Sequence, residues 1–243
     1  MNVAIVGGAG TVGREAADAL KRRGHAVQVL SRAGGVDLRL ALGDALLGAE
    51  VVLHAAGGDR DVLVGGSARL LAAAPDAHHV LLSVVGADRI PARRFRDKAD
   101  QEEILRTGGA PFTILRATPV HARLAGLLRR AARCGVLPSG PLRLQPIAAA
   151  EVGGALADIA EAEPSGAVTR LAGPEILTLT ELGRQWRAAT GAHTVALPLP
   201  LPGAAGRALR AGALTDPGAW RGRVRFADWL GPGVPLAVAG AAA

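Results

Sequence analysis

Short apolar runs alternate with longer amphipathic segments along the first half of the chain. Five runs predict strands, at 2–7, 26–32, 49–57, 78–86 and 112–118, the first of them buried. Two segments with helical spacing of apolar residues, 10–24 and 98–109, each end in glycine. The stretch after residue 32 has room only for a vestigial strand around 36–40. Strands that alternate with helices predict an α/β fold, a doubly wound parallel Rossmann sheet.

The second half is less regular and indicates a smaller structure beside the sheet. Thr178 lies three residues before Glu181, as in a capping box, and 197–203 predicts an extended or turn-rich connector. Helical patterns cover three segments, 124–135, 149–162 and 178–191. We expect a dinucleotide-binding core over 1–118 and a small C-terminal substrate-binding lobe over 119–243, interleaved as one structural unit.

A glycine-rich turn, "VGGAGTVG", joins the first predicted strand to the first helix. Gly7 would allow a tight turn, Gly10 a close approach of the backbone to a pyrophosphate, and Gly13 close packing of helix on sheet. The amides of Thr11 and Val12 would then point at phosphate oxygens from the helix N-terminus. The strand–turn–helix context favours a dinucleotide site over a plain turn in a glycine-rich chain.

The end of the second predicted strand indicates which dinucleotide would bind. An acidic residue there would hold the ribose 2′-hydroxyl of NAD, but the strand ends in Ser31 and Arg32. A hydroxyl and a guanidinium suit a 2′-phosphate, which a carboxylate would repel. We therefore expect NADP, with NAD as the lesser alternative. Otherwise Arg32 is one more exposed arginine in an arginine-rich chain.

Composition narrows the class of protein. Hydrophobic residues make up 49% of the chain and aromatic residues 2%, so the core must be aliphatic, with helices packed through Ala and Gly. The net charge of +7 does not favour nucleic acid, because the arginines are scattered and no aromatic residues lie between them. The single cysteine, Cys134, excludes an intrachain disulfide and fits a reducing compartment. No signal peptide and no bilayer-length apolar run is evident, so we expect a cytoplasmic protein.

Several motifs in order resemble the atypical short-chain dehydrogenases, specifically the NmrA-like NAD(P)-binding proteins. The resemblance covers nearly the whole chain. It includes "VGGAGTVG", "VLSR", "VVLHAAG", "LLSVVGADRIP", "RDKADQE", "TILRAT", "LQPIAAAEVGGALADIA" and "LAGPEILTLTEL". The ordered series is more specific than the glycine turn alone.

This resemblance implies a series of cofactor contacts. Ser83 would face the nicotinamide, and Lys98 would bind the nicotinamide ribose. The other implied contacts run from the adenine (Asp37 and Leu38) past the ribose and pyrophosphate (Ala55, Ala56 and Gly57) to the nicotinamide ring (Thr118 and Pro119). A compact ammonium suits ribose hydroxyls better than a planar guanidinium does. Lys98 is one of only two lysines in the chain, which favours a site role over a solvated helix start.

One residue of the family pattern is missing. Relatives with Tyr-x-x-x-Lys use the phenol to give a proton to the developing alkoxide. This chain has Arg94 four residues before Lys98, with Phe95 beside it, and contains no tyrosine. A guanidinium is a poor proton donor because it stays charged. Carbonyl reduction by the usual acid is therefore in doubt.

Other side chains offer few replacements for that acid. His121 follows a predicted strand where the substrate cleft should begin, and it is our candidate acid or base, although a surface or helix-start role is an alternative. We expect His54 to be structural and His78 and His79 to face solvent. No metal-ligand spacing is present. The acidic residues near Lys98 fit the first turn of a helix, where the dipole favours them: Asp97, Asp100, Glu102 and Glu103.

Three functions fit these residues. The first is an NADPH-dependent reductase of a small organic molecule, such as a quinone, an enone or an imine, whose reduction needs little acid. The second is a non-catalytic NAD(P)-binding sensor with a protein partner. The third is a redox-neutral isomerase, cyclase or lyase in the same cleft. Either a monomer or a homodimer is compatible with the sequence.

Overall fold

The computed structural model describes residues 1–231, so the last part of the predicted lobe, 232–243, lies outside the described residues. Seven parallel strands form one sheet in the order β11-β8-β5-β4-β3-β1-β2. They are β1 (Asn2–Val6), β2 (Ala26–Leu30), β3 (Val51–His54), β4 (His78–Val84), β5 (Phe112–Ala117), β8 (Val168–Ala172) and β11 (Trp220–Arg221). All five strands predicted in the first half are confirmed.

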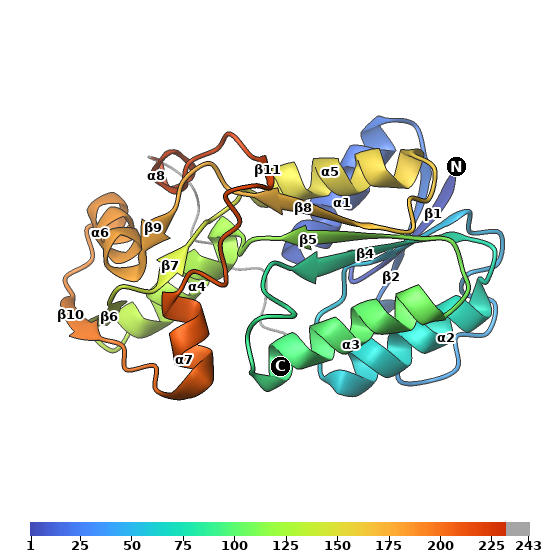
Figure 1. Cartoon of the computed structure of the whole chain (residues 1–243). Coiled ribbons are helices and arrows are strands. Elements are labelled where there is room, and N and C mark those ends of the chain that lie inside the picture. The colour runs from blue at the N-terminus through green and yellow to red at the C-terminus, as the bar shows by residue number, and fades with distance from the viewer. Residues whose placement is uncertain (232–243) are drawn as a thin grey trace.

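Helices cover both faces of this sheet (Figure 1). On one face lie α1 (Thr11–Arg22) and α5 (Ala149–Glu161), and on the other α2 (Gly66–Ala73) and α3 (Arg93–Thr107). A short π-helical turn, Asp61–Gly65, leads into α2. The predicted doubly wound parallel sheet is therefore confirmed. Because β2 and β3 lie on opposite sides of β1, the strand order reverses there, and in open α/β sheets ligands bind outside the carboxyl ends of the strands at such a point, here β1 and β3.

Small residues bring α1 and α5 close together. A Cβ atom on Gly153 would lie 2.6 Å from the carbonyl carbon of Glu15 and 2.7 Å from the Ala16 nitrogen. The buried cluster around this contact is aliphatic, with Leu20 and Leu156 among its members. The predicted core of aliphatic residues and close Ala/Gly helix contacts is present here.

The second half of the chain builds the lobe and also completes the sheet. The lobe, at the left of Figure 1, contains α4 (His121–Ala132), β6 (Val136–Ser139), β7 (Arg143–Leu144), β9 (Leu177–Thr178), α6 (Leu179–Thr190), β10 (Val195–Pro198), α7 (Gly203–Arg210) and α8 (Phe226–Trp229). Its core holds aromatic residues, Trp186 and Phe226. Since α5, β8 and β11 return to the sheet, the chain crosses between sheet and lobe more than once. The division at residues 118 and 119 stays a prediction.

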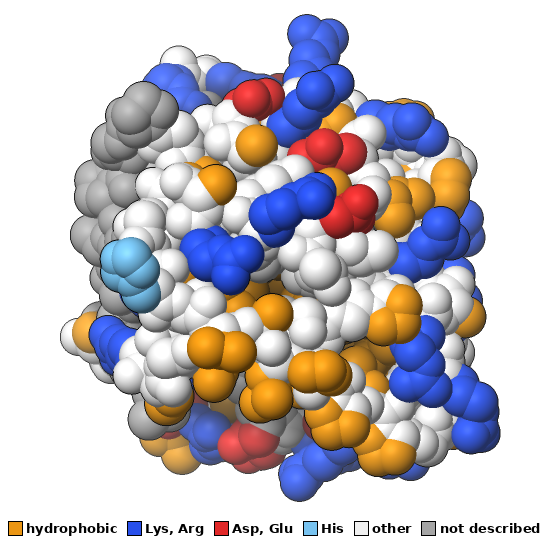
Figure 2. Space-filling model, turned by 90° about the vertical axis from the view of Figure 1, so that its left-hand side faces the viewer, with side chains coloured by type: hydrophobic (Ala, Val, Ile, Leu, Met, Phe, Trp, Pro, Cys, Tyr) orange, Lys and Arg blue, Asp and Glu red, His pale blue; other side chains and the backbone are white. Residues whose placement is uncertain are grey.

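An apolar strip covers part of the lobe's end face. Figure 2 shows hydrophobic side chains gathered over the lower part of this face. The strand β10 pairs with β6, and its Val195 and Leu197 are 71% and 56% exposed.

The capping box of α6 is confirmed, because Glu181 N donates to Thr178 Oγ1 and Thr178 N donates to the Glu181 carboxylate.

Three predicted elements differ from the structure. The stretch 36–40 forms turns, not a strand, because Ser31 and its neighbours fold back in a 3₁₀ turn, Arg32–Gly34. The connector 197–203 overlaps the end of β10. The helix predicted from residue 98 begins at Arg93, so its first turn contains no acidic residue. The dipole explanation for the acidic run is therefore wrong, and two of its members are buried, Asp97 and Glu102.

Candidate functional site

The glycine turn has the geometry that its sequence predicts. Gly7 has φ +80°, and a Cβ there would lie 2.5 Å from the Ala56 nitrogen. At Gly13 a Cβ would lie 2.2 Å from the Gly7 carbonyl oxygen. The Gly10 amide donates to the Gly7 carbonyl at 2.9 Å, which closes the turn. Only glycine fits at positions 7 and 13, because both must touch backbone.

The turn presents an open helix N-terminus. Gly10 is the N-cap residue of α1, no side chain caps it, and the first turn has no acidic residue. The first amides of a helix, here those of Thr11 and Val12, lack partners within the helix. Gly10 itself is exposed. This uncapped, glycine-lined N-terminus fits the pyrophosphate of a dinucleotide.

Ser31 and Arg32 lie at the carboxyl end of β2, next to β1. Ser31 Oγ accepts the Gly34 amide at 3.2 Å and so caps the 3₁₀ turn. Arg32 is exposed, and its guanidinium forms no hydrogen bond or ion pair with any other residue in the range 1–231. A free guanidinium beside a capped turn fits a 2′-phosphate.

The predicted adenine and ribose contacts come together beside β3. Asp37 accepts the Arg39 amide at 3.0 Å, and Arg39 also pairs with Asp59 at 2.9 Å. Leu38 is buried, and with Ala56 it lines a narrow gap that is too small to hold a water molecule. Ala55 and Ala56 are half-buried, and Gly57 is exposed. These residues therefore lie at the point where the strand order reverses.

Lys98 is anchored at the end of β4. Its Nζ donates to the Leu82 carbonyl at 3.0 Å and to Gln101 Oε1 at 2.8 Å. Burial, and then the nearby charge of Arg94, lower the pKa of Lys98 to about 8, although Glu102 opposes the shift. An ammonium carries three donors, so one N–H remains for a ligand.

A buried row of hydrogen bonds continues inward from Gln101. Its Nε2 donates to Ser67 Oγ at 2.9 Å. Ser67 Oγ lies 3.3 Å from His54 Nδ1, and His54 Nε2 lies 2.9 Å from His79 Nδ1. The row ends where His79 Nε2 meets the Ala74 carbonyl at 2.8 Å. Both histidines are buried, and burial lowers the pKa of each, that of His54 far below its ordinary value.

Elementary hydrogen-bond chemistry fixes the direction of every bond in this row. The Ala74 carbonyl can only accept, so His79 Nε2 carries a proton, and the neutral ring then accepts at Nδ1. By the same argument His54 donates from Nε2 and accepts at Nδ1 from the Ser67 hydroxyl. The expected structural role of His54 agrees with this arrangement. The expectation of solvent-facing His78 and His79 is wrong, because both are buried and His78 bonds Thr113 at 3.0 Å.

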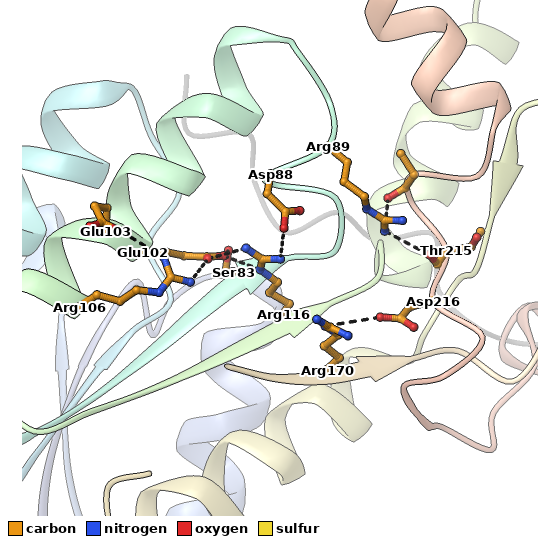
Figure 3. Close-up of polar contacts among 11 residues, drawn as sticks. Ser83, Asp88, Arg89, Glu102, Glu103, Arg106, Arg116, Arg170, Thr215 and Asp216 are labelled. Atoms are coloured by element: carbon orange, nitrogen blue, oxygen red, sulfur yellow. Dashed lines mark hydrogen bonds and ion pairs between the residues drawn. The ribbon is translucent and has the colours of Figure 1, made fainter. Parts of the chain in front are cut away.

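A charged cluster that the sequence did not predict surrounds Glu102, which lies one helical turn after Lys98 on α3 (Figure 3). Glu102 is fully buried and accepts two bonds from Arg116, at 2.8 and 2.7 Å, and one from Arg106 at 2.8 Å. Burial raises the pKa of Glu102, but the bonds from Arg116 and Ser83 outweigh it and keep that pKa below its ordinary value. Arg116 also pairs with Asp88 at 2.8 Å. The cluster ties α3 to β4 and β5.

Ser83 belongs to this cluster. Its hydroxyl donates to Glu102 Oε1 at 2.5 Å, and its side chain is buried. The hydroxyl proton is therefore engaged within the protein, not free for a ligand. The signal that could have revealed the cluster is the arginine inside the apolar strand "FTILRA", since a buried arginine requires a carboxylate partner.

The residues after β5 are also engaged within the protein. Thr118 is buried, and its Oγ1 accepts a hydrogen bond from the Gly173 amide at 3.2 Å. Pro119 is half-buried, and its carbonyl accepts a hydrogen bond from the Ile147 amide at 3.2 Å. They lie at the carboxyl end of β5, beside the end of β4, as the predicted order of contacts requires.

His121 is not at an open cleft. It is fully buried, with ring centroids 5.5 Å from those of Phe226 and Trp229. Within residues 1–231, neither ring nitrogen has a hydrogen-bond partner. Burial lowers the pKa of His121 to about 4, and the nearby Pro146 carbonyl offsets only part of that shift. The structure thus places His121 in the lobe core, and a catalytic role for it stays a prediction.

Neither a metal site nor a membrane-spanning helix is found among the described residues. No group of His, Cys, Asp and Glu side chains between residues 1 and 231 is arranged to hold a metal ion. Within the same range, no helix is both long and apolar enough to cross a membrane.

Comparison with known proteins gives a fold and no sequence family. No family model matches the sequence, and a search of curated proteins finds no significant match. NADPH-dependent quinone oxidoreductase QOR2 of Escherichia coli, solved with NADPH, matches with a TM-score of 0.74 at 20% identity, over 89% of this chain and 92% of that one. UDP-glucose 4-epimerase of Thermotoga maritima, solved with UDP-glucose, matches with a TM-score of 0.74 at 20% identity, over 95% and 96%.

A third solved structure also matches this chain. It is a short-chain dehydrogenase/reductase superfamily protein of Agrobacterium tumefaciens with bound NAD, with a TM-score of 0.69 at 20% identity, over 95% of each chain. The fold that the motif resemblance implies is thereby confirmed. The chain has the Rossmann fold shared by short-chain dehydrogenase-type oxidoreductases and nucleotide-sugar epimerases.

Proposed function

We propose that this chain binds NADPH along the carboxyl edge of its sheet and reduces a small organic molecule. The observation that carries the proposal is the glycine turn. Its backbone is packed on Ala56, and it leaves an uncapped helix N-terminus beside the unpaired Arg32. The likeness to a quinone oxidoreductase solved with NADPH supports the same cofactor.

Each part of the edge would hold one part of the cofactor. The amides of Thr11 and Val12 would bind the pyrophosphate, and Ser31 and Arg32 the 2′-phosphate. The free N–H of Lys98 would bind the nicotinamide ribose. When bound, the reduced nicotinamide supplies a hydride to an electron-poor atom of the substrate.

The side chains around the ring limit the substrates. The Ser83 hydroxyl donates its hydrogen bond to Glu102, and His121 is buried without contact to solvent. Arg94 is a poor acid because its guanidinium stays charged. A quinone, an enone or an imine suits this setting, because its reduction needs no acid at the reacting atom. A quinone or enone delocalises the product anion, which takes its proton from water, and a protonated imine is already cationic.

The test follows NADPH oxidation by absorbance over a panel of quinones, enones and imines. We expect turnover with NADPH well above that with NADH. Arg32→Ala should weaken NADPH binding roughly tenfold to a hundredfold, since a charge-assisted hydrogen bond contributes about 1.5–3 kcal/mol. Arg184→Ala, which removes another exposed arginine, is the matched control and should bind normally.

The same engaged side chains favour one alternative, an NAD(P)-binding sensor without turnover. Tight NADPH binding with no oxidation over the whole panel would support that alternative and contradict the reductase. Absence of NADPH binding by calorimetry would contradict both functions.

A further inference from the structure

Three cationic residues, Lys98, Arg94 and Arg123, lie on the helices that follow β4 and β5, at the end of the sheet where the nicotinamide would lie. Lys98 and Arg94 are one helical turn apart on α3 and therefore share a face. Arg123 lies in the first turn of α4, which starts four residues after β5 ends. The charge of Arg94 reaches both neighbours, since after burial it is the next cause that lowers the pKa of Lys98 and of Arg123.

Neither arginine of this group has a partner. Between residues 1 and 231, neither the Arg94 guanidinium nor the Arg123 guanidinium forms a hydrogen bond or ion pair. Other arginines on α3 do, since Arg93 pairs with Asp97 and Arg106 with Glu102. Glu102, the carboxylate whose charge acts on Lys98, is already bound by Arg116. The positive charge of the group is thus uncompensated within the described protein.

The backbone adds to this positive field. The first turns of α3 and α4 contain no acidic residue and no side-chain cap. A cation in the first turn of a helix opposes the helix dipole, and three neighbouring cations also repel one another. This electrostatic repulsion destabilises the protein when no ligand is bound, and a bound anion would relieve the repulsion.

The cofactor's own phosphates do not account for the group. Their predicted contacts lie at β1 and β2, whereas Lys98 is anchored at β4 and α4 follows β5. Four strand spacings of about 4.8 Å separate β2 from β5, a distance of about 19 Å. The anion that fits here belongs to the other reactant.

We propose that Arg94 and Arg123, beside Lys98, bind an oxyanion of the substrate, so that the preferred substrate carries a carboxylate or a phosphate next to the atom that accepts hydride. This inference rests on the proposed reductase and names its substrate class. The replacement of the tyrosine by Arg94 then exchanges an acid for a substrate anchor. A guanidinium fork suits both oxyanions.

Anion binding is tested without turnover. Benzoate and phenyl phosphate are titrated by calorimetry into the protein saturated with NADPH. We expect binding of one or both, and Arg94→Ala or Arg123→Ala should weaken it roughly tenfold or more. Arg96→Ala is the matched control, because Arg96 is exposed on the same helix but faces away from Arg94, and it should leave binding unchanged.

Turnover is tested on pairs of quinones or enones that differ only by a carboxylate or a phosphate. Arg94→Ala should raise KM for the charged member by roughly tenfold or more relative to its effect on KM for the neutral member. If neutral substrates turn over but no anion binds, or if Arg94→Ala affects both members equally, the anion site is overturned and the reductase stands. If the anions bind in an Arg94-dependent way but nothing is reduced, the anion site stands and the reductase fails.

Discussion

The ammonium group of Lys98 is held in surroundings that oppose its charge. Burial and Arg94 lower the pKa of Lys98 from 10.5 to about 8, so in the folded chain its proton is lost at a lower pH than in the unfolded chain. Between pH 8 and 10.5 the unfolded chain binds the extra proton, and stability therefore rises with pH in that window.

This sign leads to a prediction with a matched control. The free energy of unfolding of the wild type, measured relative to Lys98→Met, should rise by about 1 to 2 kcal/mol between pH 7 and pH 9.5. Lys21 is the only other lysine and is exposed, so the difference from Lys21→Met should stay flat. Denaturant titrations at each pH measure both. A flat difference for Lys98 would mean that its ammonium is as well solvated as that of Lys21.

Single residues could be predicted from the sequence where the local backbone geometry accepts only one residue type. Gly7 and Gly13 could be predicted because a tight turn against backbone excludes every side chain. Gln101, Glu102 and Arg116 could not, because their functions depend on partners up to 34 residues away in the sequence, as in the bond between Gln101 and Ser67. The solvent exposure expected for His79 failed for the same reason, since His54 is its partner.

At the scale of elements, the contact between α1 and α5 distinguishes two adjacent glycines. Gly153 touches the backbone of α1, whereas nothing lies within 4 Å of a Cβ on Gly154. Gly154→Ala should stabilise the protein by about 0.4–1 kcal/mol, because alanine loses less backbone entropy in a helix. Gly153→Ala should destabilise it by about 1–3 kcal/mol through overpacking.

Chemical denaturation of the two variants measures this difference, and each serves as the other's control. Equal effects from both substitutions would contradict the close helix contact. The test also separates packing from helix propensity, because both positions lie within α5 and gain the same propensity from alanine.

Elements of the first half were predictable because their apolar runs are long and regularly spaced. The strands β8 and β11 were not predicted. The first, "VTRLA", is short and carries an arginine, and the second has two residues and forms only by pairing with β8. The strand expected at 36–40 failed because turn hydrogen bonds there replace strand pairing.

At the scale of the whole molecule, two arginines join the segment after α7 to the sheet side, Arg89 and Arg170, of which Arg170 pairs with Asp216 at 3.7 Å (Figure 3). Arg89 follows β4 and donates to the carbonyls of Ala213 and Thr215, at 3.0 and 3.4 Å. A Cβ on Gly86 would lie 2.3 Å from the Ala213 carbonyl oxygen, so the two segments are in close contact. The segment after α7 thus packs on the loop that precedes α3.

Arg89→Ala should loosen this segment without unfolding the sheet. We expect faster amide hydrogen exchange around residues 211–216 and unchanged exchange in β1 and β3. Arg187→Ala removes a similar bond to a carbonyl, that of Thr194, but within the lobe, and should leave 211–216 unchanged. Uniformly faster exchange over the sheet would show that Arg89 stabilises the fold as a whole.

The row of neutral hydrogen-bonding groups behind Lys98, from Gln101 to the Ala74 carbonyl, has an electrostatic consequence. Its bonds all point away from the ammonium, so they add up to a dipole whose negative end is the Gln101 oxygen. A carboxylate in that position would hold the lysine equally well, but its full negative charge would repel an anionic cofactor or substrate nearby. A dipole attracts the cation beside it and fades quickly with distance. The protein can thus fix a positive charge in its interior and still present that charge, undiminished, to an approaching anion.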